Sequence, residues 1–538
     1  MEELHMIDKT KEPVVKTKAG KLRGTYIDGV YRFLGVHYAQ DTSGENRFMP
    51  PKPVEPWEGE KLAQEYVAKC WQHDHPGVED AWVKSTDMFR RQQKLMERSS
   101  EMGMGKQTED CLALNIWTKG LGDGKQRPVM VWLHGGGDFA GAAEADWHDG
   151  YNLANKQDVV LVTVGHRLAI FGYIDLREYG DKFKDSVNLG HQDMVMALQW
   201  IHDNIEAFGG DPGNVTIFGQ SGGGGKVCAL MGMPGAKGLF HKAIVQSGGF
   251  LGATNEKSAA VTKEFLDHLG ITKDNIEDLW KYPPEELIRI QREINATRDP
   301  SDMSNYLIFP SVLDGKFIKY NPFDGAEGSE YSKEIYMING GTKDDSRLGT
   351  LMNQKVFDYT FEDVANFIAR FGYTKEQTGK IIDIYKDMLK DEIKEEIKPV
   401  DVYCAFSQDQ RGLKGNIERY RARAAVGAAP YYSYVFAFEG PYSDMKAIHG
   451  VDVPFFFDNG QYATGIWTAD TYVDAMKLSD TAGASWAAFA RTGDPSCAQL
   501  GVWKPFDEKD YYTMVFDAES KLVSDYRAPG RKVAMGEV

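Results

Sequence analysis

The sequence predicts an α/β fold with a mostly parallel central sheet and helices on both of its faces. Short continuous apolar runs occur at residues 128–133, 158–164, 215–218, 242–246, 334–338 and 430–438. Segments with helical spacing of apolar residues separate several of these runs. A continuous apolar run is typical of a strand that is buried on both faces, as strands of parallel sheets are. Alternation of such strands with helices favours the layered α/β class.

The individual elements follow in chain order. The run at 128–133 ends at a glycine cluster, and the run at 158–164 precedes a predicted helix over residues 193–207. That helix carries apolar side chains three or four positions apart, which is the spacing of one helix face. After the strand at 215–218, residues 226–233 are predicted to be helical. The run at 430–438 is rich in Tyr, Val and Phe, which favour strands.

Two long segments, 254–305 and 357–423, are charged and predicted to be mostly helical, for example over 284–295 and 380–398. No Ser/Gly linker, low-complexity tract or internal repeat divides the chain. We therefore expect one domain over residues 1–538, in which both segments are helical insertions at the edge of the sheet.

Composition narrows the classes of function. The net charge of −17 disfavours nucleic acid as a partner, because phosphate binding needs clustered Lys and Arg. No run approaches the roughly 20 apolar residues of a membrane span. Residues 1–5 lack the apolar stretch of a secretory signal, which favours a cytoplasmic protein. The five cysteines are too few for a disulfide scaffold and too scattered for a zinc site, so reduced thiols are expected.

Residues 219–223 form a G-x-S-x-G pentapeptide between a predicted strand and a predicted helix. A serine on such a sharp turn is pushed out of the sheet, so Ser221 is a candidate nucleophile. A serine hydroxyl needs a neighbouring base, and the base needs an orienting carboxylate. Among the downstream histidines, His241 and His268 fit structural positions. His449 lies in a loop before a strongly apolar segment and is the candidate base, with an ordinary surface-loop histidine as the alternative.

Two further segments supply the remaining groups of an acyl-transfer site. Residues 335–346 end a predicted strand in a glycine turn followed by Asp344 and Asp345, which are candidate orienting acids unless the turn is simply solvated. Residues 131–137 are a strand that runs into a His-Gly-Gly-Gly turn, where backbone amides can converge on a negatively charged oxygen. A phosphate-binding loop is disfavoured there, because no Gly-Lys-Ser/Thr ending follows.

The stretch 208–223 resembles the active-serine signature of the type-B carboxylesterases, and segments 18–24, 33–39 and 109–116 continue the resemblance over most of the chain. The resemblance implies an α/β-hydrolase fold. It also implies a triad of Ser221, His449 and Asp345, with Asp344 as runner-up for the acid. The resemblance implies that the amides of Gly136, Gly137 and Gly222 are the oxyanion donors.

That resemblance further implies hydrolysis of small alkyl or aryl carboxylic esters, hydroxycinnamoyl esters included, without a metal or organic cofactor. Non-catalytic adhesion proteins of the same family are the alternative, disfavoured because every catalytic role can be filled here. In secreted members the cysteine at position 111 pairs with an upstream one, here Cys70. Six aromatic residues are candidates for a substrate pocket: Phe139, Trp147, Phe171, Phe455, Phe456 and Trp467.

Four positions depart from the family's usual residues. Gln220 replaces a common glutamate and removes a negative charge beside the serine. Gly222 replaces a common alanine, which predicts extra room beside the oxyanion donors. Asp138 follows the glycine turn where an aromatic is usual, which predicts a more polar entrance, and Met194 replaces a glutamine.

Overall fold

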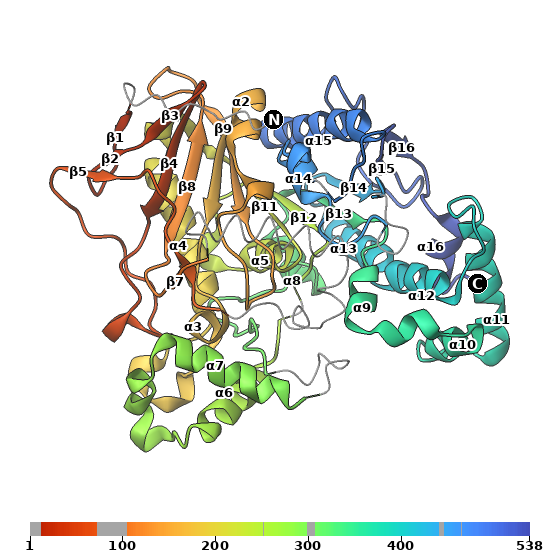
Figure 1. The fold of residues 1–538 in the computed structure, drawn as a ribbon, viewed down its shortest axis with the longest axis horizontal. Helices are drawn as coiled ribbons and strands as arrows, with labels where there is room; N and C mark the ends of the chain where they lie inside the picture. The colour runs from red at the N-terminus through yellow and green to blue at the C-terminus, as the bar shows by residue number, and fades with distance from the viewer. Residues whose placement is uncertain (1–11, 73–104, 251, 299–306, 441–445, 464) are drawn as a thin grey trace.

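The computed structural model describes residues 12–538 apart from 73–104, 251, 299–306, 441–445 and 464 (Figure 1). Its centre is an 11-stranded sheet in the order β16-β15-β14-β13-β12-β11-β9-β10-β8-β4-β3. The strands are β3 (Thr25–Ile27), β4 (Val30–His37), β8 (Ala113–Thr118), β9 (Arg127–Leu133), β10 (Val160–Val164), β11 (Gly210–Gln220), β12 (Lys242–Gln246), β13 (Tyr336–Thr342), β14 (Tyr431–Phe436), β15 (Thr513–Phe516) and β16 (Lys521–Val523).

The strands from β10 to β15 in this order run parallel to one another. Antiparallel pairs flank them, β10 with β8 and β8 with β4 on one side and β15 with β16 on the other. All six predicted apolar runs lie on strands of the parallel part. The prediction of a mostly parallel sheet is therefore confirmed.

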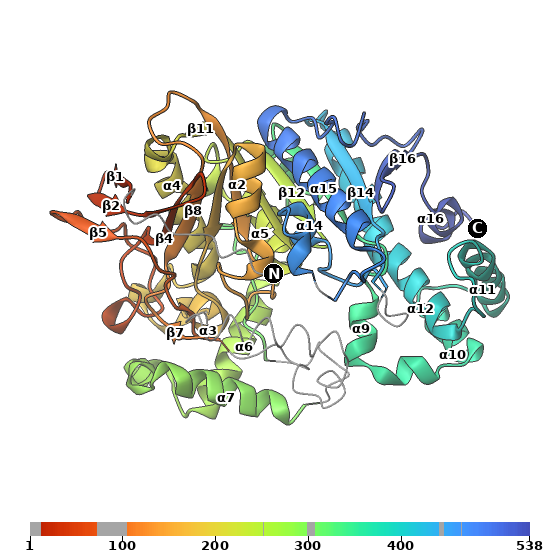
Figure 2. The ribbon, with the colours of Figure 1, turned by 45° about the horizontal axis from the view of Figure 1, so that its top comes forward.

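Helices cover both faces of the sheet (Figures 1 and 2). Val129 and Val131 of β9 pack in one core cluster with α3 (Ala169–Tyr173), α4 (Leu189–Asn204) and α5 (Gly222–Met231). Met130 and Trp132 point the other way, into a cluster with α2 (Tyr151–Gln157), α14 (Val453–Phe456) and α15 (Tyr472–Thr492). Each large apolar side chain buried in this way contributes roughly 1.5–3 kcal/mol, so both faces hold the layers together.

The two predicted insertions are largely helical. The first contains α6 (Asn255–His268) and α7 (Pro284–Ala296), and the second contains α10 (Phe361–Ala369), α11 (Lys375–Leu389), α12 (Pro399–Gln408) and α13 (Lys414–Ala424). The predicted helix over 380–398 is wrong beyond Leu389. Ile393 and Ile397 pack back onto the small core of α10 to α12. Pro399 then disfavours helical backbone at the residue before it.

Another prediction is wrong at the end of the strand predicted over 334–338, where a glycine turn was expected. β13 continues through Gly340 and Gly341 to Thr342. A Cβ at Gly340 would lie 2.2 Å from the carbonyl oxygen of Tyr434 on β14, so glycine permits this close pairing. The turn therefore begins at Lys343.

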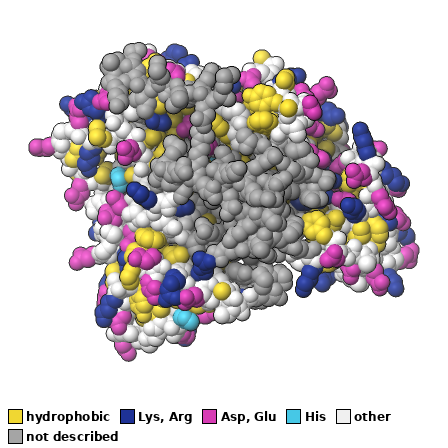
Figure 3. All heavy atoms as spheres, in the orientation of Figure 1, with side chains coloured by type: hydrophobic (Ala, Val, Ile, Leu, Met, Phe, Trp, Pro, Cys, Tyr) yellow, Lys and Arg dark blue, Asp and Glu magenta, His cyan; other side chains and the backbone are white. Residues whose placement is uncertain are grey.

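On the face drawn in Figure 3, acidic and basic side chains are interspersed over the described surface. Neither acidic nor basic side chains gather in one large patch on the described surface of this face. Within the described residues, no helix is both long and apolar enough to cross a membrane.

Candidate active site

Ser221 stands at the junction of β11 and α5 with φ of 59° and ψ of −123°. A positive φ is unusual for a residue with a Cβ and is typical of a strained turn that presents a nucleophile. The turn is fixed by its backbone, because the Ser221 amide donates to the Gln246 carbonyl at 2.8 Å and its own carbonyl accepts from Gly225. Ser221 directly follows the last residue of β11 and is half-buried.

Asp345 and His449 meet although they are 104 positions apart in the chain. The Nδ1 atom of His449 lies 2.9 Å from both carboxylate oxygens of Asp345. Thr342 donates a further bond to the same carboxylate at 3.1 Å. Burial alone would raise the pKa of Asp345, but His449 and the neighbouring hydroxyls outweigh burial and lower it. Burial likewise tends to lower the pKa of His449, and Asp345 reverses this and raises it.

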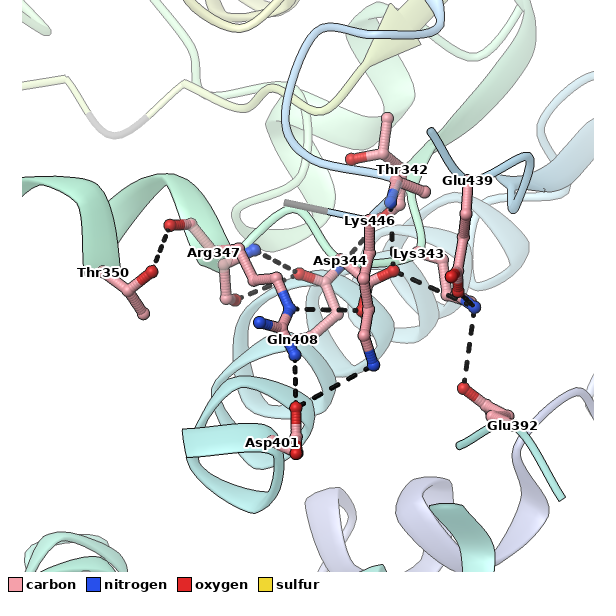
Figure 4. A network of polar contacts seen from close by, with 12 residues as sticks. Thr342, Lys343, Asp344, Arg347, Thr350, Glu392, Asp401, Gln408, Glu439 and Lys446 are labelled. Atoms are coloured by element: carbon pink, nitrogen blue, oxygen red, sulfur yellow. Dashed lines mark hydrogen bonds and ion pairs between the residues drawn. The ribbon is translucent and has the colours of Figure 1, made fainter. Parts of the chain in front are cut away.

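Asp344 does not contact the imidazole; it holds the loop that carries it. The Asp344 amide donates to the Ala447 carbonyl at 3.0 Å, and the Ala447 amide donates to the Asp344 carboxylate at 3.3 Å. Figure 4 shows that Asp344 also belongs to a network of charged side chains. Arg347 lies 3.8 Å from its carboxylate and 2.5 Å from Asp401 of α12. The network therefore joins the acid turn to the second helical insertion.

The side of the His449 ring that points away from Asp345 contacts Gln220. The Nε2 atom of His449 lies 3.1 Å from the side-chain nitrogen of Gln220. Because Asp345 accepts the Nδ1 proton, Nε2 carries the lone pair and the Gln220 amide donates to it. In the described part of the chain no hydrogen bond joins Ser221 to His449. The structure thus pairs His449 with Asp345 but leaves the bond to the serine unmade.

Three of the predicted glycines lie together beside Ser221. Gly136 and Gly137 have φ of +86° and +61°, so the turn after β9 uses backbone that favours glycine. A Cβ at Gly222 would lie 2.4 Å from the amide nitrogen of Gly137. The prediction of extra room at Gly222 is therefore wrong, because the turn closes onto α5 and fills the space.

We expect Gly222→Ala to lower kcat by about 100-fold, because the methyl group must push the Gly137 amide away from the position where a negative oxygen forms. Steady-state kinetics on a p-nitrophenyl ester measure the effect. Gly379→Ala on α11 is the matched control, since nothing lies within 4 Å of its added Cβ. Unchanged kcat for Gly222→Ala would contradict the packing described here.

The candidate pocket aromatics divide into two groups. Phe171, Phe455 and Phe456 are at most 2% exposed and belong to the core clusters. Phe139 is also buried in a core cluster, where it packs against Gly137, whereas Trp147 and Trp467 are half-buried.

Two further expectations concern Asp138 and the cysteines. Asp138 accepts bonds from the Ser311 amide at 3.0 Å and from its hydroxyl, so this carboxylate anchors a neighbouring loop. Cys70 and Cys111 are free, buried thiols that lie side by side. A hydrogen bond to Cys70, together with burial, raises the pKa of the Cys111 thiol.

Sequence reasoning missed one buried acid next to the site. Asp452 is completely buried, accepts from Tyr434 at 2.9 Å and from Gln246 at 3.2 Å, and burial raises its pKa to about 6. Its position three residues after His449 was the available signal. No group of three or more His, Cys, Asp or Glu side chains within the described ranges is arranged to hold a metal ion.

Comparison with known proteins places these features in a family. A sequence model of the Carboxylesterase family matches residues 11–531. The chain is 30% identical to the para-nitrobenzyl esterase of Bacillus subtilis, over 96% of this chain and 98% of that protein. A carboxylesterase structure from Geobacillus stearothermophilus aligns with a TM-score of 0.78 and 30% identity, over 97% of this chain and 99% of that one.

A third similar protein is an esterase from Clostridium hathewayi, described as hydrolysing aliphatic aromatic polyesters. Its structure aligns with a TM-score of 0.75 and 31% identity, over 99% of this chain and all of the other. The sheet described above is accordingly that of an α/β-hydrolase. The chain therefore belongs to the carboxylesterase family and is a carboxylic ester hydrolase.

Proposed function

We propose that the protein hydrolyses small carboxylic esters through an acyl-enzyme on Ser221. The observation that carries the proposal is the hydrogen bond from His449 Nδ1 to Asp345, which leaves Nε2 unprotonated and facing Gln220, the residue before the strained Ser221. Nε2 takes the Ser221 proton as the hydroxyl attacks the ester carbonyl, and returns it to the leaving alcohol. Water then repeats these steps on the acyl group.

The amides of Gly136, Gly137 and Gly222 are the proposed donors to the tetrahedral oxyanion. For the first step, Nε2 must leave the Gln220 amide and accept from Ser221. Bonds of this kind are often long or absent without substrate and form in the substrate complex. The proposed reaction uses no metal or organic cofactor. The cytoplasmic location expected from the sequence stays a prediction.

The proposed substrates are alkyl and aryl esters, with hydroxycinnamoyl esters among them. The aromatic side chains proposed to contact an acyl or alcohol group are Phe139, buried beside Gly137, and the half-buried Trp147 and Trp467. Two similar proteins, one named a para-nitrobenzyl esterase and one described as hydrolysing aliphatic aromatic polyesters, support aryl groups. A panel of p-nitrophenyl and hydroxycinnamate esters ranks these groups by kcat/KM.

Labelling with a fluorophosphonate followed by peptide mass mapping tests the nucleophile. We expect one adduct, on the peptide that contains Ser221, and loss of activity in proportion to labelling. An adduct on a different peptide, or active protein that takes up no label, would overturn the assignment.

The pH profile provides a second test. Because the pKa of His449 is raised, its base form appears only above the ordinary value of about 6.5, and activity should rise across that higher range. Gln220→Glu places a negative charge beside Nε2, stabilises the imidazolium and should move the rise to still higher pH. Gln377→Glu on α11 makes the same charge change in a helix cap and should leave the profile unchanged. A rise that stays in place in Gln220→Glu would count against His449 as the base.

A further inference from the structure

Lys226 is a buried amine at the start of the turn that carries the proposed oxyanion donors Gly136 and Gly137. It lies on α5 one helical turn after Gly222, so the two residues share a helix face. Its side chain is 1% exposed, and its ammonium donates to the carbonyl oxygen of His134 at 2.9 Å. Burying a lysine ammonium costs free energy unless the charge is paired and hydrogen-bonded. The mechanism above gives this cation no role.

The bond from Lys226 is made at the point where β9 becomes the glycine turn. His134 follows the last residue of the strand and immediately precedes Gly135, Gly136 and Gly137. The His134 ring donates to the Gly135 carbonyl at 2.9 Å and stacks on His166 with ring centroids 4.6 Å apart. A charge-assisted bond to the His134 carbonyl therefore fixes the start of the turn.

An acidic residue fixes the other end of the same turn. Asp138 follows Gly137, its carboxylate is held by Ser311, and its carbonyl accepts from the Ala169 amide at 2.8 Å. Attraction to Asp138 also favours the charged form of Lys226. The two charges thus bracket the three glycines, with the cation on the side of α5.

We propose that Lys226 is a positioning residue for the oxyanion hole. Its ammonium holds the His134 carbonyl so that the Gly136 and Gly137 amides stay against Gly222, and it adds positive charge beneath the developing oxyanion. This inference rests on the proposed function and adds to it the group that keeps the donors in place.

The charges around Lys226 give this role a pH signature. Among the described residues, the titratable groups that interact electrostatically with it are Asp138 in the turn, His134 after β9, His166 after β10 and His191 on α4. Burial lowers the pKa values of the three histidines, so they are neutral near pH 7. Burial also lowers the pKa of Lys226, to about 8. Its charge should therefore be lost within the range in which esterases are assayed.

The experiment compares Lys226→Met with the wild type and with Lys242→Met. Lys242 is also buried, at 7% exposure, but lies at the opposite end of its strand from the glycine turn. For Lys226→Met we expect kcat to fall about 10- to 100-fold with little change in KM, because fewer donors meet the transition state. A trifluoromethyl ketone, which forms a tetrahedral oxyanion on the serine, should lose affinity by the same factor. The matching non-fluorinated alcohol should not. Lys242→Met should keep wild-type kcat.

The pH profile keeps the test decisive if Lys226→Met folds poorly. Wild-type kcat should fall above about pH 8, and Asp138→Asn should move this fall to lower pH by weakening the charged form of Lys226. Unchanged kcat and ketone affinity in a folded Lys226→Met, or a wild-type profile flat to pH 10, would overturn the proposal. Full activity of Ser221→Ala would instead overturn the proposed function itself.

Discussion

Ser221→Ala is expected to abolish ester hydrolysis, lowering kcat by about 10⁴- to 10⁶-fold, because no acyl-enzyme can form without the hydroxyl. The remaining glycine amides can still bind the carbonyl, so KM should change little and a residual rate above that of water should persist. Stopped-flow measurement of p-nitrophenol release gives the first-turnover burst and the steady-state rate. The burst of the first turnover should disappear together with the steady-state rate.

The control for this substitution is Ser485→Ala on α15. Ser485 is completely buried and bonds to the Pro495 carbonyl, so it reports the effect of removing an interior serine hydroxyl. We expect wild-type kcat and normal fluorophosphonate labelling in this variant. A Ser221→Ala protein with more than a few per cent of wild-type kcat would require another nucleophile.

Asp345→Asn should lower kcat by about 10³- to 10⁴-fold with the fold intact. Asparagine has nearly the same shape, but its amide does not fix the Nδ1 proton or stabilise the imidazolium. The pKa of His449 should fall at the same time, because Asp345 is the group that raises it. Kinetics as a function of pH and a histidine NMR titration measure the two effects separately.

Asp344→Asn is the matched control, one position away. We expect it to lower the stability of the fold rather than kcat. Its carboxylate supports the Ala447 amide and the Arg347 network rather than the imidazole. Neutralising it leaves buried cations with fewer partners and should cost about 1–3 kcal/mol of unfolding free energy. Thermal unfolding should respond more than kcat. If Asp344→Asn is the variant that loses kcat, the orienting acid has been assigned one position too late.

Local patterns were enough to predict much of the architecture. Buried parallel strands are continuous apolar runs, so β9, β10, β11 and β12 could be located from the sequence alone. The pairing of Asp345 with His449 was implied by the resemblance to the type-B carboxylesterases, and the structure brings the two side chains into contact. The expectation of a single domain over 1–538, and the catalytic roles themselves, stay predictions.

Features that depend on tertiary contact were missed or misjudged. The space at Gly222 is set by a turn 85 positions earlier in the chain, and nothing local to Gly222 reports where Gly137 comes to rest. Likewise, Gln220 and His449 are 229 positions apart, so their contact could not be foreseen. The helix expected to reach residue 398 ends at Leu389, because tertiary packing of Ile393 overrides local helix propensity.

The strained backbone at Ser221 lowers the stability of the fold. A side chain held at φ of 59° and ψ of −123° costs roughly 1–3 kcal/mol, which the surrounding strand and helix must offset. Glycine would adopt the same conformation with little strain. On stability alone glycine is therefore the better residue at position 221, and the proposed nucleophile is held in place at a cost to the stability of the fold.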